Sequence, residues 1–430
     1  MNFARLNHIL IPATKEGRDR FRQGRVARLL LGPLARTWFS LTDEGRGLLA
    51  FSMAASLAGL DVIHGQNHLL WALCFSLIVA SLAARPLLRI RAVRLDVAGP
   101  ERVAVGAEAR FRVRVSNDGP VACSALRLSL PFLPWDGTWS RAERAIARLE
   151  PGARAQLEAT ARFVERGHHH IDSFALSALV PLGLATGPAV ESRGTRFVVV
   201  PRIARVARLD LPARPRHQPG GVAFASHTGE STELAGLRAW RDGDRIRDLH
   251  ARSWARLGEP VVREYQQEYF SRVAVVVDGD AALASERAFE ASVSVAAGII
   301  ERLMHGEALI DLLATGEAGG VLTLGRSLGG LDQALDRLAE LRPSGPFDRE
   351  VAFAPLRGRL ERLSAIVFVT LAWNDARAGF VERIERAGCG VRVVGVCEGA
   401  SPFTPRDPRI RAVEVDRIES ATHATTGLAL

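Results

Sequence analysis

The chain has 430 residues and a mass of 46.6 kDa, too long for one ordinary hydrophobic core, so the length predicts two or three domains. A hydrophobic content of 47% and a mean hydropathy of +0.07 are high for a fully soluble protein, while 24% charged residues is too many for a polytopic transporter. The composition therefore predicts soluble domains joined to a short membrane anchor.

Lysine is almost absent, because Lys15 is the only lysine among 56 Lys and Arg residues. A Walker A P-loop, a protein kinase and a pyridoxal phosphate enzyme each need a lysine in a defined position, which excludes these classes. Residues 1–45 are predicted to be a basic cytoplasmic N-terminal segment, because residues 1–46 hold nine Lys and Arg against four Asp and Glu. These residues supply about half of the net charge of +9, and the remainder of the chain is close to balanced. This distribution argues against nucleic acid as a partner.

Residues 46–84 are predicted to form two transmembrane helices. Two apolar runs, Gly47–Ile63 and Leu69–Ala84, flank the polar stretch His64–His68, and each approaches the roughly 20 residues that span a bilayer. Arginines precede and follow the pair and none lies in the loop, so the positive-inside rule places both ends in the cytoplasm. The alternative is a buried two-helix hairpin of a soluble domain.

The four cysteines are predicted to be free thiols in a reducing compartment. They form no CxxC pair and have no zinc spacing, and they are Cys74, Cys123, Cys389 and Cys397.

Residues 85–202 are predicted to form a β-sandwich of immunoglobulin-like type. Polar and apolar residues alternate in segments such as Phe111–Val115, and turn signals occur at Asn117–Pro120 and at Pro151-Gly152. Such domains usually bind or space other domains.

Residues 203–258 are predicted to be a linker followed by a charged block. We expect a helix over Asp244–Leu257 with Asp244 as its N-cap. His and Arg side chains together form a strong donor array, so the block is either an anionic site or a docking surface for a partner; the alternative is an ion-paired helix fixed to the next domain. The candidate binding or docking residues are Arg238, Trp240, Asp244, Arg247, His250 and Arg256.

Residues 259–430 are predicted to form an α/β domain with a parallel sheet covered on both faces. Fully apolar strands alternate with amphipathic helices, as this architecture requires. The expected strands include Val273–Val277, Ala308–Ala314, Ala365–Thr370 and Val391–Val396, and the expected helices include Glu286–Met304, Leu331–Leu341 and Asp375–Ala387.

The segment Leu237–His250, followed by Ala255-Arg256 and Val262–Glu264, resembles the signature of the uncharacterised family called domain of unknown function fifty-eight. Ala251 stands where that family usually has tryptophan. The stretches Leu41–Gly47 and Pro181–Leu184 agree with the family as well. The resemblance implies a membrane-anchored protein whose partners are MoxR-type AAA+ ATPases and von Willebrand factor A proteins, and a C-terminal sheet similar to a von Willebrand factor A domain. It implies no enzymatic activity.

A metal site is one alternative use of the α/β domain. A metal-binding von Willebrand factor A domain carries Asp-x-Ser-x-Ser after its first strand. Here Asp278 and Asp280 supply two oxygen-bearing positions, but Ala282 has no ligand atom. The alternative to a divalent-metal-dependent ligand binder is a carboxylate that simply ends a strand.

A serine hydrolase is a second alternative, because residues 325–329 match G-x-S-x-G with Ser327 in the centre. His423 would be the base, and Asp348 or Asp375 the acid. The histidine run 168–170 suggests chelation on a strand, but a third ligand is not evident, so a solvated edge strand is favoured.

The sequence as a whole predicts a non-catalytic scaffold or adaptor at the bacterial inner (cytoplasmic) membrane, with its soluble domains facing the cytoplasm. It would dock partner proteins, with a MoxR-type AAA+ ATPase, in complex assembly or envelope maintenance. Membrane lipid is the other expected partner, and no catalytic residue, metal or cofactor is expected.

Overall fold

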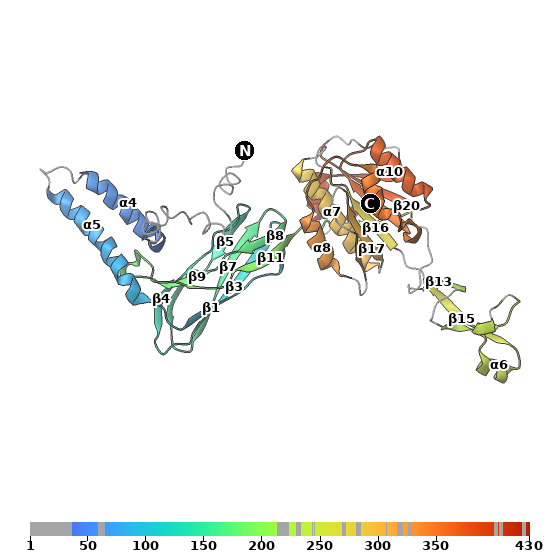
Figure 1. Ribbon diagram of the computed structural model, residues 1–430, viewed down its shortest axis with the longest axis horizontal. Helices are drawn as coiled ribbons and strands as arrows, with labels where there is room; N and C mark the ends of the chain where they lie inside the picture. The colour runs from blue at the N-terminus through green and yellow to red at the C-terminus, as the bar shows by residue number, and fades with distance from the viewer. Residues whose placement is uncertain are drawn as a thin grey trace. The chain divides into compact units, whose positions relative to one another are not determined.

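The computed structural model describes residues 37–430 except 59–64, 213–222, 229–233, 243, 245, 269–271, 281–284, 307, 316–320, 326–328, 400–402, 404–406 and 424–426. The chain divides into two compact units, Met1–Val200 and Pro201–Leu430. Figure 1 shows a helical hairpin and a β-sandwich in the first unit, and an α/β body with an appended module in the second. The multidomain architecture predicted from the sequence is confirmed at this level.

The helical hairpin consists of α4 (Asp43–Ala58) and α5 (Gly65–Ala84), and the 3₁₀ turn η1 (Arg85–Leu88) follows it. Among the described residues, one segment, His68–Leu88, is long and apolar enough to cross a membrane, with a mean hydropathy of 1.8. The described length of α4 is 16 residues, about 24 Å at 1.5 Å per residue, which is less than the roughly 30 Å of a bilayer core. By length and composition, the segment His68–Leu88, which contains most of α5, is therefore a candidate membrane helix, and the apolar run that includes α4 continues into residues outside the description.

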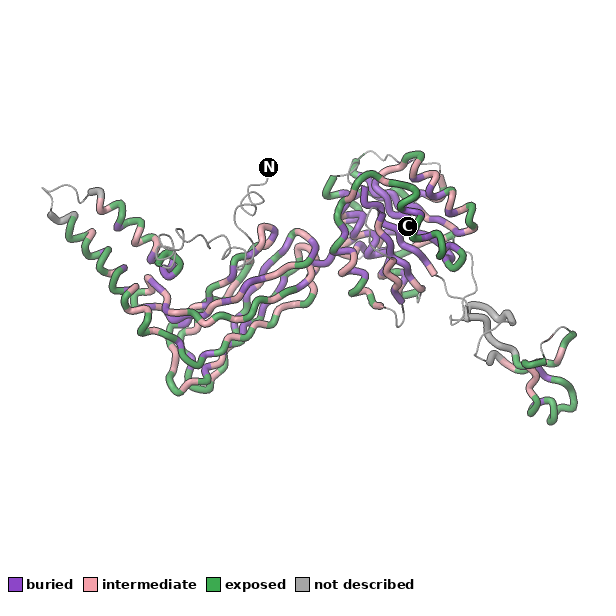
Figure 2. The backbone as a smooth tube through the Cα atoms, viewed as in Figure 1, coloured by how far each residue is buried: buried purple, intermediate pink, exposed green. Residues whose placement is uncertain are grey.

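Many residues of α4 and α5 are exposed, as Figure 2 shows. The exposed large side chains include Phe51 and Met53 on α4 and Leu69, Leu73 and Phe75 on α5. A helix that is apolar on all sides is typical of a buried or membrane-spanning element.

The sandwich is built from antiparallel sheets with strand orders β1-β3-β7-β5 and β10-β9-β4-β6, plus a three-stranded sheet β2-β11-β8 in which β2 and β11 are parallel. Strand β3 shows why these residues form a sheet: Ala109, Phe111, Val113 and Val115 are buried while the intervening arginines face outward. The strands are β1 (Val93–Ala98), β2 (Arg102–Ala104), β3 (Glu108–Asn117), β4 (Cys123–Ser129), β5 (Gly137–Ala142), β6 (Ala145–Leu149), β7 (Arg154–Phe163), β8 (Gly167–Ile171), β9 (Ala175–Ala178), β10 (Val190–Glu191) and β11 (Thr195–Val200).

The hairpin base is attached to the sandwich through the turn η2 (Pro181–Gly183) and the residues after it. Thr42 Oγ1 donates to the carbonyl of Gly183 at 2.7 Å, and Arg85 Nε donates to the carbonyl of Thr186 at 2.7 Å. Leu41, Ile78, Val180 and Ala185 form a small buried cluster here. Two stretches that carry the family resemblance, Leu41–Gly47 and Pro181–Leu184, therefore lie in contact.

The appended module contains β13 (Ala223–Thr228), β14 (Leu234–Ala239), η3 (Ile246–Asp248), α6 (Ala251–Leu257) and β15 (Val261–Glu268), in the sheet order β13-β15-β14. This corrects two sequence predictions. The linker predicted from residue 203 contains strands, and the module continues beyond residue 258 because β15 supplies the central strand of its sheet.

The α/β body has a six-stranded sheet of order β18-β17-β16-β19-β20-β21, in which β18 alone is antiparallel to its neighbour. Strand β19 is buried at every position, and β16 is apolar and buried after Arg272, as strands covered on both faces must be. The strands are β16 (Arg272–Val277), β17 (Leu309–Ala314), β18 (Leu322–Leu324), β19 (Ala365–Thr370), β20 (Gly390–Cys397) and β21 (Ile410–Glu414).

Helices cover both faces of this sheet. One group contains α7 (Glu286–His305), which contacts α8 (Leu331–Glu340) and α11 (Val415–Ala421). The other contains α9 (Arg349–Phe353), η4 (Ala354–Leu356), η5 (Leu360–Arg362) and α10 (Asp375–Arg386), which share one buried cluster with β19 and β20. The strand β12 (Val206–Arg208) pairs with β22 (Leu428–Ala429), so residues predicted as linker belong to this body.

Candidate functional site

The charged block lies in the appended module, where Arg238 and Asp244 form its central ion pair. Arg238 is on β14 and donates through both terminal nitrogens to the Asp244 carboxylate, each at 2.7 Å. Asp244 also accepts the backbone N–H of Arg241 at 2.8 Å. The hydrogen bonds from Arg238 and Arg241 lower the pKa of Asp244 to about 2, so this pair stays charged at physiological pH.

The predicted helix over Asp244–Leu257 is wrong in its first half. The helix α6 begins at Ala251, after the 3₁₀ turn η3. Asp244 has no helix to cap, because its carboxylate is held by Arg238. His250 occupies the N-cap position of α6, where its Nδ1 lies 2.8 Å from Ser253 Oγ and its backbone N–H donates to Val261 at 2.8 Å.

The candidate docking residues therefore divide into two groups. Arg238 and Asp244 form the bidentate pair, Trp240 donates its backbone N–H to Pro260 at 2.9 Å, and His250 is half-buried, so these four support the module itself. Arg247 and Arg256 are exposed.

The module leaves large apolar side chains exposed beside these arginines. Ile246, Trp254 and Leu257 are 77%, 43% and 61% exposed. The short helix α6 buries only Ser253. Exposed apolar side chains gathered next to arginines are typical of interaction surfaces, in which Trp and Arg are enriched.

A second cluster of charged residues lies at the carboxyl edge of the α/β sheet, where β16 and β19 are neighbouring strands. The helices that follow these two strands, α7 and α10, cover opposite faces of the sheet. This is the switch point at which open α/β sheets commonly bind ligands. Asp278 follows β16 directly and is fully buried. Arg377, near the start of α10, is also fully buried, and its Nε donates to Asp278 Oδ2 at 2.7 Å while its Nη2 donates to Asp280 Oδ2 at 2.9 Å.

Both carboxylates accept further hydrogen bonds. Asp278 also accepts from Thr370 Oγ1 at 2.7 Å and from the backbone N–H of Asp280 at 3.1 Å. Asp280 accepts the backbone N–H of Phe347 at 3.1 Å. Burial alone lowers the pKa of Arg377, but Asp278 and Asp280 outweigh it and raise that pKa above the ordinary value. The guanidinium thus lies between the two carboxylates that the metal-site alternative would use.

Sequence reasoning missed Arg377, although a signal was present. It lies two residues after the start of α10, which itself follows β19, so topology brings it to the same sheet edge as Asp278. The described residues hold no group of three or more His, Cys, Asp or Glu side chains able to bind a metal.

His423 and Asp348, two residues of the hydrolase alternative, have other partners. Ser327 lies outside the described residues. His423 has its Nε2 2.9 Å from Arg202 Nη1, which can only donate, so that nitrogen serves as an acceptor. Asp348 caps α9 through the N–H groups of Glu350 and Val351. Strand β18, which precedes the motif, is antiparallel, so it ends at the amino edge of the parallel strands rather than at the carboxyl edge where a nucleophile elbow stands.

The histidine run lies on β8, where its members have separate surroundings. His169 is half-buried, with Nε2 2.7 Å from Asp136 Oδ2 and Nδ1 2.9 Å from the carbonyl of Gly167. His170 Nε2 is 3.4 Å from Asp172, and His168 is exposed. The pairing of His169 is structural, since both ring nitrogens face acceptors inside the sandwich.

The fold and these sites define a multidomain protein with a β-sandwich, an α/β body and, among the described residues, one candidate membrane helix. No family model matches the chain. The uncharacterized protein YeaD of Bacillus subtilis is 26% identical over 163 residues, which are 37% of this chain and 39% of YeaD. The match therefore spans about two fifths of that relative's length.

Solved structures with local similarity share little sequence with the chain. A FixG-related protein from Vibrio parahaemolyticus is 17% identical, with a TM-score of 0.19, over 26% of this chain and 98% of that one. A CARDB domain from Pyrococcus furiosus is 14% identical, with a TM-score of 0.18, over 25% and 92%. Trypsin-activated alpha-2-macroglobulin from Escherichia coli is 16% identical, with a TM-score of 0.22, over 37% and 9%.

Proposed function

We propose that this protein is a membrane-anchored, non-catalytic adaptor that docks a partner protein through the appended module. The observation that carries the proposal is the exposed surface of this module, which combines Ile246, Trp254 and Leu257 with Arg247 and Arg256. We call these five residues the docking surface. The bidentate ion pair links Arg238 on β14 to Asp244, which precedes η3. This pair fixes the backbone that leads into the docking surface.

The chemistry of this surface selects the kind of partner. A tryptophan beside two arginines provides an apolar anchor and planar donors for carboxylates. The complementary surface is an apolar pocket with Asp or Glu at its rim. Removal of water from around Trp254 contributes affinity, while the arginines orient the partner and raise the association rate.

The resemblance of the charged block to the family of unknown function named above suggests the identity of the partner, a MoxR-type AAA+ ATPase acting in complex assembly or envelope maintenance. We also infer that the α/β body is similar to a von Willebrand factor A domain. The support is its strand order, in which the antiparallel β18 lies at one edge and β16 and β19 in the middle. The membrane is proposed to be the bacterial inner membrane, with both units in the cytoplasm.

Affinity capture of the full chain from detergent-solubilised membranes, with and without ATP, tests the adaptor role. Wild type should retain a MoxR-type ATPase identified by mass spectrometry. Trp254→Ala should weaken binding by about 2 kcal/mol or more, roughly thirtyfold in Kd. Arg247→Ala and Arg256→Ala should lower the association rate, with a reduced salt dependence.

The matched control is Arg386→Ala, which removes an exposed arginine of α10 that pairs with Glu382. The docking variants should keep the wild-type melting temperature, since the three side chains are exposed. Equal recovery of the ATPase by Trp254→Ala and wild type would contradict the assignment of the docking surface.

A further inference from the structure

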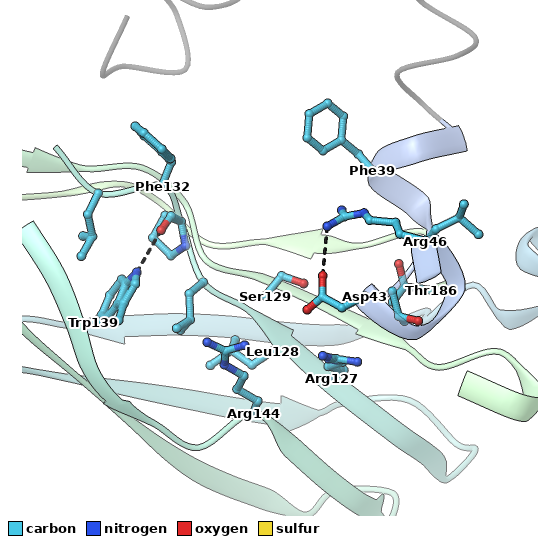
Figure 3. A pocket seen from close by; sticks show the side chains of 15 residues that line it. Phe39, Asp43, Arg46, Arg127, Leu128, Ser129, Phe132, Trp139, Arg144 and Thr186 are labelled. Atoms are coloured by element: carbon cyan, nitrogen blue, oxygen red, sulfur yellow. Dashed lines mark hydrogen bonds and ion pairs between the residues drawn. The ribbon is translucent and has the colours of Figure 1, made fainter. Parts of the chain in front are cut away.

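A cavity of about 470 Å³ lies where the helical hairpin meets the β-sandwich. Figure 3 shows its lining, with Phe39, Asp43 and Arg46 contributed from the start of the hairpin and Arg127, Trp139 and Arg144 from the sandwich. The cavity lies within the first unit, where Thr42, Gly45 and η2 hold the two parts together.

The lining carries an excess of positive charge. It contains three arginines and one acid, Asp43. Arg46 pairs with Asp43 at 3.0 Å, and Arg127 lies 3.7 Å from the exposed carboxylate of Glu44. Within the described part of the chain, Arg144 has no ion pair, and it is exposed. A third guanidinium beside Arg127 therefore faces the cavity with its charge uncompensated.

Aromatic side chains lie in or near the same cavity. Trp38, Phe39 and Phe132 are about half exposed or more, and Phe39 and Phe132 line the cavity. Trp139 is held in the wall by a hydrogen bond of 3.1 Å from its Nε1 to the carbonyl of Pro131. Exposed aromatic side chains next to the end of an apolar helix are typical of the membrane–water interface.

We propose that this cavity binds the phosphodiester headgroup of an anionic phospholipid. This inference rests on the membrane anchor in the proposed function, because the candidate span includes Arg85, whose Nε donates to the carbonyl of Thr186 in the cavity lining. Arg127 and Arg144 bind the phosphate oxygens, because guanidinium groups form paired hydrogen bonds with phosphate. Phe39 and Phe132 contact the glycerol and the first acyl carbons. A zwitterionic headgroup is disfavoured, since its cationic end meets the same arginines.

Binding of short-chain lipids to the full chain in a neutral detergent tests this site. Native mass spectrometry and thermal denaturation would follow titrations with dioctanoyl phosphatidylglycerol, dioctanoyl phosphatidylcholine and inorganic phosphate. Phosphatidylglycerol should bind and raise the melting temperature, and phosphatidylcholine should do so much less. Arg144→Gln and Arg127→Gln should each weaken phosphatidylglycerol binding about tenfold, the loss of one charge-assisted contact of about 1.4 kcal/mol.

Arg148→Gln is the matched control, because Arg148 is an exposed arginine on β6 that pairs with Glu150 and lies outside the cavity lining. Equal binding of the two lipids, or equal binding by Arg144→Gln and Arg148→Gln, overturns the proposal. Inorganic phosphate that binds at millimolar concentration as effectively as the lipid would identify a site for free phosphate. That result would also overturn the proposal. Arg144→Gln should capture the partner protein as well as wild type does. A failure of the lipid-site proposal is therefore distinguishable from a failure of the adaptor proposal.

Discussion

At the scale of single residues, the buried Arg377 explains how the carboxyl edge of the sheet is closed. Its guanidinium pairs with both Asp278 and Asp280, two buried acids that would otherwise repel each other inside the body. The cost of removing one member of such a group is large, because the charges left behind have neither water nor a partner.

Arg377→Met, which keeps most of the side-chain volume, should lower the free energy of unfolding by about 3–5 kcal/mol. Denaturant unfolding of the full chain in detergent measures this change. Arg386→Met, on the same helix but exposed, should cost less than about 1 kcal/mol. Adding Asp278→Asn and Asp280→Asn to this variant removes the unpaired charges and should recover part of the lost stability. A loss below about 1 kcal/mol for Arg377→Met alone would refute the stabilising role of Arg377.

The same ion pair predicts that stability is independent of divalent cations. Both carboxylates are occupied by Arg377 and by hydrogen bonds. The melting temperature should therefore not change on adding Mg²⁺ or on adding EDTA. A shift with Mg²⁺ that disappears in Asp278→Ala would instead establish the metal-binding alternative.

His169 should make the sandwich less stable as the pH rises. Burial alone lowers the pKa of His169, but the hydrogen bonds to Asp136 and to the carbonyl of Gly167 outweigh it and raise the pKa above 6.5. A raised pKa means that the stabilisation is complete below pH 6.5 and is lost as the pH passes the folded-state value. Melting curves at successive pH values should show this decline in wild type and a flatter profile in His169→Gln; parallel profiles would show that His169 does not contribute.

At the scale of elements, the attachment of α4 to the sandwich depends on Gly45. A Cβ at this position would collide with the carbonyl oxygen of Leu184, whereas a Cβ at Gly47 of the same helix meets nothing within 4 Å. Alanine in place of glycine usually favours a helix by about 1 kcal/mol. Gly47→Ala should therefore leave the melting temperature unchanged or higher.

Gly45→Ala should lower the melting temperature, because the helix must move away from η2 and weaken the hydrogen bond from Thr42 to Gly183. Limited proteolysis should also cleave the segment 180–187 faster in this variant. Equal stability of the two alanine variants would show that the close contact does not hold the hairpin.

The sequence predicted elements well where burial alone determines them. The run Ala365–Thr370 matches β19 in full, and Val273–Val277 matches β16 to within one residue, because a strand covered on both faces is apolar throughout. Prediction failed in the charged block, where apolar spacing suggested a helix from Asp244. The pair of Arg238 with Asp244 determines the backbone there, and a partner six residues away leaves no periodic signal.

The candidate sites were predictable to a similar degree. Asp278 was identified as a carboxylate ending a strand, which the structure confirms, but its partner Arg377 is 99 residues away and only the sheet topology brings them together. The contact between Leu41–Gly47 and η2 also depends on residues far apart in sequence, so neither stretch alone indicated it.

At the scale of the whole molecule, the account depends on α5 anchoring the chain while the charged block docks a cytoplasmic partner. The segment His68–Leu88 has the length and hydropathy of a membrane helix. Insertion of about 20 apolar residues is effectively irreversible, unlike peripheral attachment through arginines alone.

Membrane fractionation with protease accessibility tests this central claim most directly. After washing with alkaline carbonate, the chain should stay in the membrane pellet. Protease added to intact spheroplasts should leave residues 85–430 uncut, and the same protease should digest them after lysis. Release of the chain by carbonate, or digestion of those residues in intact spheroplasts, would contradict the account.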